Sequence, residues 1–172
     1  MKMKMTFAGA VALLGGVGAF AATPKIDGKL DDACWAAATW HSDFSRPSDY
    51  RKRTTPLPKA EFAFAHDAHT LYVAARCCEL DMDAVRALKV SRPWSGNEIE
   101  FFLSPSGMPD EYYHFILSPN ADKQYAQYYA EGGGIRPDPF SPSWTWAFAW
   151  EKDAWTAEAA IPLSAFYMTR NA

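Results

Sequence analysis

The 172-residue sequence predicts an all-β fold, an antiparallel β-sandwich of short strands. Aromatic residues make up 15% of the chain and include seven Trp, which argues against a disordered or coiled-coil protein. Twelve Pro and ten Gly, together with Asp and Ser, divide the sequence into short runs. Within these runs apolar and polar side chains alternate, as they do in strands that bury one face.

The first 21 residues have the pattern of a secretory signal peptide. Lys2 and Lys4 form a positive start, an apolar run covers 7–20, and Ala-Phe-Ala at 19–21 is typical of a cleavage site. We therefore expect a mature domain over 22–172 that is secreted or periplasmic. The apolar run is too short to cross a bilayer, and no second run follows, so we expect no membrane insertion of the mature chain.

The predicted strands follow one another with short turns between them. In chain order they cover 59–66, 71–79, 97–104, 111–119, 123–130, 144–151 and 154–161. Turn-forming residues predict hairpins at 66–69, at Pro105-Ser106-Gly107 and at Lys152-Asp153. Short helical turns are expected at 30–37, 81–88 and 163–167.

Alternation within strands predicts which side chains share a face. In 97–104 and 111–119 the apolar face is formed by Ile99, Phe101, Leu103, Tyr113, Phe115 and Leu117. If the two strands pair as a hairpin, the opposite face collects Glu98, Glu100, Tyr112 and His114. The strand 71–79 has an apolar face of Leu71, Val73, Ala75 and Cys77, and its second face adds Arg76 to the polar group.

Charge and cysteine content exclude several functions. The formal net charge is −3 and the main basic cluster is Arg51-Lys52-Arg53, so nucleic acid is not expected as a partner. The three cysteines, Cys34, Cys77 and Cys78, allow at most one intrachain disulfide, for example from Cys34 to either of the others. Their spacing is not that of a zinc site, and small buried core residues are the alternative interpretation.

Five blocks of sequence carry a family resemblance. They are IDGKLDDACW at 26–35, HDAHTLYVA at 66–74, WSGNEIEFFL at 94–103, YYHF at 112–115 with Pro119-Asn120, and WTAEAAIPL at 155–163. In this order they resemble the family 9-like carbohydrate-binding domains. The resemblance covers residues 25–167.

The resemblance implies a β-sandwich with immunoglobulin-like or jelly-roll strand order. It also implies a non-catalytic sugar site where aromatic rings flank a pyranose, in a module attached to or acting beside a glycosidase domain. The expected ligand is an oligo- or polysaccharide such as xylan or cellulose. Family members continue past the IPL block with a further strand, so we expect this chain, which ends at Ala172, to lack its C-terminal strand.

Sugar binding needs flat aromatic surface and groups that hydrogen-bond to hydroxyls. Trp94, in a Pro/Ser/Gly loop, and Trp144, at an open strand end, are the candidate platforms, whereas Trp146, Phe148 and Trp150 have the spacing of core residues. Glu100 matches a recurring acidic position of the family, and Arg76 is placed by strand register. The full set of candidate ligand-binding residues is Trp94, Trp144, Arg76, Glu98, Glu100, Tyr112, His114 and Asn120.

Three alternatives remain open at this point. Some relatives bind structural calcium, for which the oxygen-bearing candidates are Asp27, Asp31, Asp32, Asp81 and Asp83, although a solvated turn explains the last two as well. Glu98 and Glu100, about 7 Å apart on one strand, suggest a glycosidase pair, yet such neighbours point the same way and cannot flank a scissile bond. A haem-binding sandwich would need His114 with a Met such as Met82 or Met108.

Overall fold

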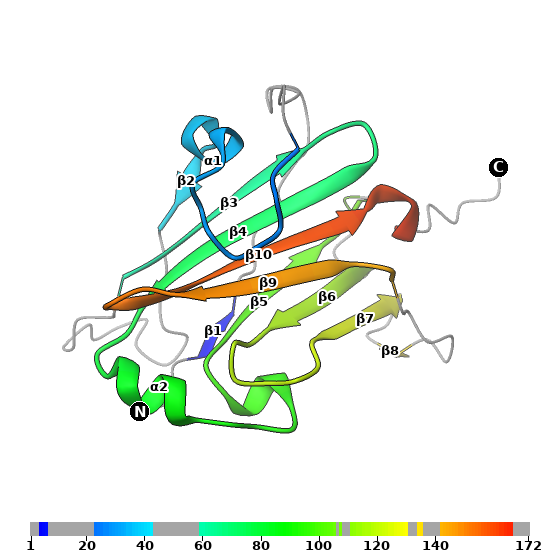
Figure 1. The fold of residues 1–172 in the computed structure, drawn as a ribbon. Helices are drawn as coiled ribbons and strands as arrows, with labels where there is room; N and C mark the ends of the chain where they lie inside the picture. The colour runs from blue at the N-terminus through cyan, green and yellow to red at the C-terminus, as the bar shows by residue number, and fades with distance from the viewer. Residues whose placement is uncertain are drawn as a thin grey trace, which may run out of the picture. The chain divides into compact units, whose positions relative to one another are not determined.

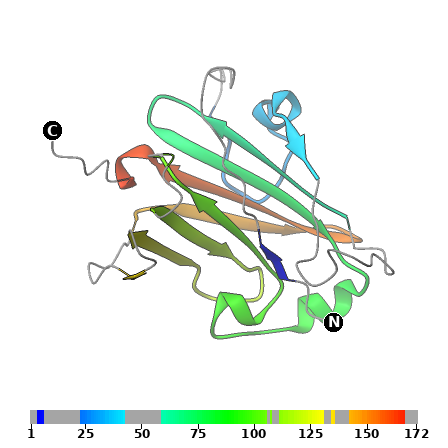
Figure 2. The same ribbon diagram turned by 180° about the vertical axis from the view of Figure 1, so that it is seen from behind.

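The computed structural model describes residues 4–6, 23–42, 59–105, 107, 111–130, 134–135 and 142–166. These residues form two five-stranded sheets with few helices (Figure 1, Figure 2). The chain divides into two compact units, one built around Lys89–Trp144 and one around Gly18–Leu88 and Thr145–Ala160. The predicted all-β class is confirmed. Among the described residues, no helix has the length and apolar character needed to cross a membrane.

The first unit contains a sheet in which β6 lies at the centre. Its strand order is β1 (Lys4–Thr6), β5 (Glu98–Leu103), β6 (Tyr112–Leu117), β7 (Tyr125–Ala130) and β8 (Gly134–Ile135). From β5 to β8 neighbouring strands are antiparallel, whereas β1 pairs parallel with β5. β1 falls within the segment that the sequence predicts to be a signal peptide. Two 3₁₀ turns, η2 (Pro93–Ser95) and η3 (Leu163–Ala165), complete the unit.

The apolar face of this sheet forms the core of the unit, as alternation predicted. Phe101 of β5 pairs with Phe115 of β6, and their rings stack at 5.0 Å with an interplanar angle of 6°. Phe166, which follows η3, adds an edge contact to Tyr113. The core side chains contributed by β5 and β6 are Ile99, Phe101, Tyr113, Phe115 and Leu117.

The second unit contains the other sheet and both α-helices. Its strand order is β2 (Trp40–His41), β3 (Ala60–His66), β4 (Thr70–Cys78), β10 (Ala154–Pro162) and β9 (Thr145–Trp150). The helices are α1 (Ala33–Ala37) and α2 (Met82–Ala87). All seven predicted strands and the three helical turns appear, while β1, β2, β8 and η2 were not predicted because each is only two or three residues long.

The two predicted hairpins of this unit are closed by backbone hydrogen bonds. In the β3–β4 turn the Asp67 amide donates to the Thr70 carbonyl over 3.0 Å, and the Asp67 carboxylate accepts the Thr70 amide over 2.8 Å. In the β9–β10 turn the Glu151 amide donates to the Ala154 carbonyl over 2.9 Å. The short polar turns therefore set the register of both strand pairs.

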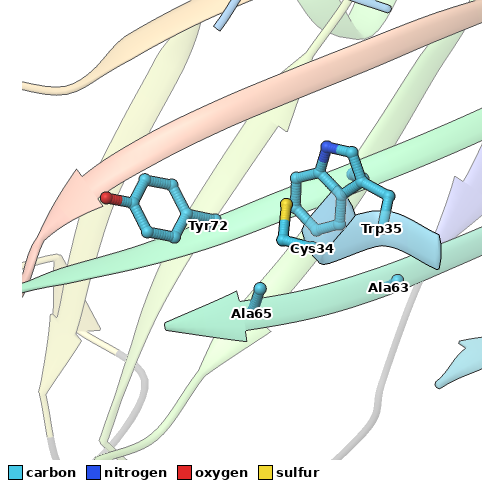
Figure 3. Packing of buried hydrophobic residues seen from close by; sticks show 6 residues of the cluster. Cys34, Trp35, Ala63, Ala65 and Tyr72 are labelled. Carbon is cyan, nitrogen blue, oxygen red and sulfur yellow. The ribbon is translucent and has the colours of Figure 1, made fainter. Parts of the chain in front are cut away.

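Helix α1 covers one face of β3 and β4. Figure 3 shows Trp35 and Cys34 of α1 lying over Ala63 and Ala65 of β3. The small alanines leave room for the indole ring, which is only 1% exposed. Tyr72, on the second face of β4, belongs to the same cluster. This second face of β4 is therefore covered near α1 and is not an open polar surface.

A buried carboxylate fastens the N-terminal segment to β10. Glu158 accepts hydrogen bonds from Trp35 Nε1 over 2.7 Å and from the amides of Gly28 and Asp27 over 2.8 and 3.1 Å. Burial raises the pKa of Glu158, and these donors oppose that shift. Gly28 has φ of +84°, and a Cβ there would stand 2.3 Å from the Phe148 carbonyl carbon, so only glycine fits.

We predict that Glu158→Gln lowers the free energy of unfolding by about 2 kcal/mol. Both carboxylate oxygens accept N–H groups, and an amide nitrogen at either position would face a donor and leave it unsatisfied. Urea denaturation followed by tryptophan fluorescence measures the change. The control is Glu61→Gln, which loses one surface ion pair with Lys59 and should cost less than about 1 kcal/mol. Equal losses in both variants would contradict the role given to Glu158.

The aromatic side chains of β9 do not all enter the core, which corrects the sequence-based expectation. Trp146 and Trp150 are 36% and 42% exposed. Phe148 instead meets the buried Trp155 edge-on, with the ring centroids 6.3 Å apart. β9 is the last strand in the order of its sheet, so fewer neighbours cover its side chains. A spacing of two along one strand indicates a shared face but not how completely that face is buried.

The three cysteines are free thiols, so the structure does not contain the disulfide considered from the sequence. Cys34 and Cys77 are buried, and burial raises the pKa of both thiols. Cys78 is half-buried on the opposite side of β4 from Cys77, and Arg76 Nη1 donates to its sulfur over 3.2 Å. Cys78 is therefore the accessible thiol of the three.

We predict that iodoacetamide modifies Cys78 at least about tenfold faster than Cys34 or Cys77 in the native protein, because exposure and thiolate character control the rate. Peptide mass spectrometry after timed labelling measures the three rates. Labelling in urea is the control, since unfolding should make the rates similar. Faster labelling of Cys77 in the native protein would contradict the structure.

Candidate functional site

One face of the first sheet carries mostly aromatic and polar side chains. The antiparallel ladders set Phe102 opposite His114, His114 opposite Gln127, and Tyr112 opposite Tyr129. We call this surface the polar-aromatic face. Its members are Glu98, Glu100, Phe102, Tyr112, His114, Ile116, Tyr125, Gln127 and Tyr129.

The centre of the polar-aromatic face is a carboxylate–imidazole pair. His114 Nε2 lies 3.0 Å from Glu100 Oε2, and the two side chains are 13% and 12% exposed. The imidazole stacks on Phe102 with the ring centroids 4.3 Å apart and the planes at 16°. Stacking on Phe102 restrains the imidazole, and the hydrogen bond to it restrains the carboxylate, while a small part of each side chain remains exposed.

Aromatic rings surround this pair. At one end Trp94 of η2 is 36% exposed and meets the Tyr125 ring edge-on at 5.4 Å. At the other end Tyr112 stacks on Tyr129, and their ring centroids are 4.9 Å apart. Between the two ends, the hydroxyls of Tyr125 and Tyr129 lie 3.4 Å apart. Burial and the hydrogen bond to Tyr129 raise the pKa of Tyr125, so its hydroxyl stays neutral at physiological pH.

A buried turn positions Trp94 beside the sheet. The Asn97 amide donates to Asn120 Oδ1 over 3.0 Å, and the Gly96 amide closes η2 by donating to the Pro93 carbonyl. Gly96 packs so closely on this turn that a Cβ would come 2.8 Å from Ser118 Oγ. The link between η2 and the turn after β6 therefore determines where the indole of Trp94 stands relative to β7.

We predict that Asn120→Ala destabilises the protein by about 2 kcal/mol, because the buried Asn97 amide loses its acceptor. Chemical denaturation measures the loss. Asp122→Ala is the matched control: Asp122 is exposed two residues further along the same turn, and its substitution should stay within about 0.5 kcal/mol. If the control variant loses as much stability as Asn120→Ala, the hydrogen bond is not what holds the turn.

The structure brings some of the predicted site residues together. Glu100, Tyr112 and His114 lie on the polar-aromatic face, and Trp94 joins it through Tyr125. Glu98 belongs to the same face but is only 1% exposed. Asn120 is buried and acts on the site through the backbone of Asn97, not from the surface.

Arg76 is not part of this surface, and the expectation that it shares a face with Glu100 is wrong. Arg76 lies on β4 in the other sheet, where its guanidinium is 2.7 Å from the Glu151 carboxylate and 3.2 Å from that of Asp153. The hydrogen bond to Glu151 raises the pKa of Arg76. Alternation assigned the correct side of β4, but it contains no information about which sheet the strand enters.

Trp144 also lies elsewhere than expected. Its ring meets Phe115 edge-on at 5.1 Å, and Phe115 belongs to the apolar face of the first sheet. Trp144 therefore packs on the core side, away from Glu100 and His114. A tryptophan at the start of a strand after Pro142 and Ser143 can turn to either side, so its position along the sequence did not decide its partner.

Sequence reasoning missed the contribution of β7. Tyr125, Gln127 and Tyr129 have a spacing of two, which is the signal that identified the faces of β5 and β6. Applied to 123–130, the same rule would have marked this strand as a second source of polar and aromatic groups. The β6–β7 ladder then places them beside His114 and Tyr112.

The acidic residues considered for calcium have local partners. Asp27 pairs with Lys25 over 3.0 Å, Asp32 accepts the Lys25 amide, Asp81 caps α2, and Asp83 lies 3.6 Å from Arg86. Within the part of the chain that the structure describes, no three His, Cys, Asp or Glu side chains gather so as to hold a metal ion. Calcium binding, including by Asp31, stays a prediction. For the haem alternative, Met82 is buried in the second unit and Met108 lies outside the described residues.

Two mainly antiparallel sheets, one with a hydrogen-bonded polar centre among aromatic rings, define a β-sandwich binding domain. The family model described as "Carbohydrate family 9 binding domain-like" matches residues 26–172, and the chain belongs to this family. The family resemblance noted in the sequence is thereby confirmed. A search of curated proteins found no match.

Solved structures support the same fold. A candidate carbohydrate-binding protein from Bacteroides uniformis is similar over 99% of this chain and 75% of its own, with 19% identity and a TM-score of 0.62. A family 9 carbohydrate-binding module from Caldicellulosiruptor kristjanssonii in complex with cellotriose is similar over 95% of this chain and 68% of its own, with 17% identity and a TM-score of 0.50. A family 9 module from the same organism in complex with glucose is similar over 95% of this chain and 70% of its own, with 17% identity and a TM-score of 0.53. The β-sandwich fold class is thus confirmed.

Proposed function

We propose that this protein binds carbohydrate without catalysing its breakdown, and that it acts as an exported module beside a glycan-degrading enzyme. The observation that carries the proposal is the Glu100–His114 pair, held 3.0 Å apart in the middle of a surface of aromatic rings. Family membership supports the general class, and the site supplies the mechanism.

The chemistry of the polar-aromatic face fits a sugar. A pyranose presents C–H groups on its ring faces, which pack on aromatic rings such as Trp94 and Tyr129. Its hydroxyls lie around the ring edge and need acceptors and donors. The Glu100 carboxylate is an acceptor, and bonds to an ionised acceptor are the strong ones. The hydroxyls of Tyr125 and Tyr129 can both donate and accept.

The ligands in the similar solved structures suggest which sugars to test first. The modules from Caldicellulosiruptor kristjanssonii were solved with cellotriose and with glucose. We infer that a β-linked glucan or xylan is the ligand class of this chain, with cellulose and xylan as the first polymers to assay.

Binding without catalysis is favoured over a glycosidase mechanism. Glu98 and Glu100 stand two residues apart on β5 and therefore on one side of the strand, and Glu98 is buried. Catalytic carboxylates must act on both sides of the scissile bond. Hydrolysis of soluble xylan or cello-oligosaccharides that disappears in Glu100→Gln would overturn the non-catalytic proposal.

Export is proposed from the first 21 residues, whose Lys2, Lys4 and apolar run have the form of a signal peptide. Mass spectrometry of the N-terminus of protein recovered from the periplasm or the medium tests this. A chain starting at Ala22 is the expected result, and a cytoplasmic protein that retains Met1 would overturn it.

We predict that Trp94→Ala and Glu100→Gln each weaken glycan binding by at least about tenfold. The first removes stacking area worth about 1.5 kcal/mol or more, and the second a charged acceptor of similar worth. Isothermal titration calorimetry with cello- and xylo-oligosaccharides measures the affinities. The control is Trp150→Ala, an exposed tryptophan of the other sheet, which should leave binding unchanged. An equal loss in Trp150→Ala, or no glycan binding by the unmodified protein, would contradict the proposed site.

A further inference from the structure

The end of the polar-aromatic face at Trp94 is bordered by basic residues. We propose that they bind the carboxylate of an acidic sugar, such as a uronic acid carried by a xylan, while its ring packs on the indole. We call this group the basic rim, and its members are Lys89, Arg92 and Lys123. The inference rests on the proposed function and adds to it a charged substituent of the glycan and the residues that recognise it.

Two segments that are distant in the sequence meet at this end of the sheet. They are 88–97, which contains η2, and 118–125, which links β6 to β7. The Val90 amide donates to the Asn120 carbonyl over 3.1 Å, and Val90 also pairs with Ala121 in an isolated parallel bridge. The first segment carries two members of the basic rim and the second carries one, so the fold gathers cations that the sequence separates.

The side chain of Gln124 fixes the second segment. Its Oε1 accepts the Ser118 amide over 2.6 Å, and its Nε2 donates to the carbonyls of Ser118 and Ala121, each over 3.0 Å. The next residue, Tyr125, meets the Trp94 ring edge-on at 5.4 Å between centroids. The backbone that carries the third cation therefore has a defined position beside the tryptophan.

The basic rim is locally positive in a chain that is acidic overall. The two segments contain three basic residues and one acidic residue, Asp122, whereas the whole chain has a formal net charge of −3. All four of these side chains are exposed, and Glu98, which follows the first segment, is buried. A local excess of positive charge attracts anions, and this one lies beside a partly exposed aromatic ring.

Arg92 is the member of the basic rim that reaches the tryptophan. Its guanidinium carbon lies 5.7 Å from the centroid of the Trp94 ring. Among the residues that the structure describes, no carboxylate pairs with Arg92, whereas the guanidinium of Arg76 pairs with Glu151. A planar guanidinium can donate two parallel hydrogen bonds to a carboxylate. A sugar packed on the indole would therefore bring a carboxylate on its ring within reach of Arg92.

The carboxylate at the centre of the polar-aromatic face is not part of this rim. Glu100 is paired with His114, whose ring meets Tyr125 at 5.6 Å between centroids, and Tyr125 in turn meets Trp94. A sugar at Trp94 can therefore direct its carboxylate toward the basic rim and its hydroxyls toward the centre of the face.

Calorimetry with two ligands of equal backbone length tests the inference: xylotriose, and xylotriose that carries one glucuronate. The unmodified protein should bind the acidic ligand at least about fivefold more tightly, because a charged pair is added to the same sugar contacts. This preference should shrink in high salt, which screens exposed charges, while the affinity for xylotriose should stay unchanged.

Variants of single cations separate recognition by the basic rim from general attraction. Arg92→Gln should lower the affinity for the acidic ligand at least about fivefold and change that for xylotriose by less than about twofold. Lys123→Gln should act in the same direction, and it replaces Arg92→Gln if circular dichroism shows that the latter does not fold. Lys152→Gln is the matched control, because it removes an exposed cation from the β9–β10 turn and should leave both affinities unchanged.

The outcomes distinguish this inference from the proposed function. Equal affinity for the two ligands in the unmodified protein would overturn the acidic-sugar site while sugar binding stands. An equal loss for both ligands in Arg92→Gln would also overturn it, because Arg92 would then act only by positioning Trp94. So would a loss in Lys152→Gln as large as that in Arg92→Gln. Absence of binding to every glycan would overturn the proposed function itself.

Discussion

Strand β6 lies between β5 and β7, and the register of its two ladders determines what can meet on each face of the sheet. His114 stands between Phe102 and Gln127, and Tyr112 stands beside Tyr129. The same strand sends Phe115 to the apolar face. A shift of one residue would move the imidazole into the core and the phenylalanine out of it, so burial of the core selects the register. The arrangement of the candidate site is therefore a by-product of the packing behind it.

Buried polar groups fix the irregular segments that the ladders do not reach. Asn120 holds the Asn97 amide and, through it, the turn that carries Trp94. Glu158 holds Gly28 and Trp35 in the second unit in the same way. A buried acceptor strongly favours the one backbone position that satisfies it, because a donor left unpaired in the interior is costly. Such contacts explain how loops far from regular structure keep defined positions.

A rigid sheet suits the proposed recognition of a flexible glycan. The Tyr112–Tyr129 and His114–Phe102 stacks hold the rings in place before any ligand arrives, so ordering these side chains costs little on binding. Trp94 is the exception, since it stands on a short 3₁₀ turn and is partly exposed. Family membership supports carbohydrate binding, and the proposed site of a paired carboxylate and imidazole beside a row of rings requires no activated group for it.

The sequence by itself determined the strands, their faces and the family. Alternation is a local property, so it identified the core side chains Phe101 and Phe115 and the polar partners Glu100 and His114, and turn residues marked the hairpins between adjacent strands. Only the tertiary structure decided which strands are neighbours in a sheet. It placed Arg76 in the other sheet with Glu151, turned Trp144 toward Phe115, and brought Tyr129 of β7 beside Tyr112. The physical reason is that a strand's pattern specifies which side is buried, whereas its neighbours depend on hydrogen-bond ladders and packing between distant segments.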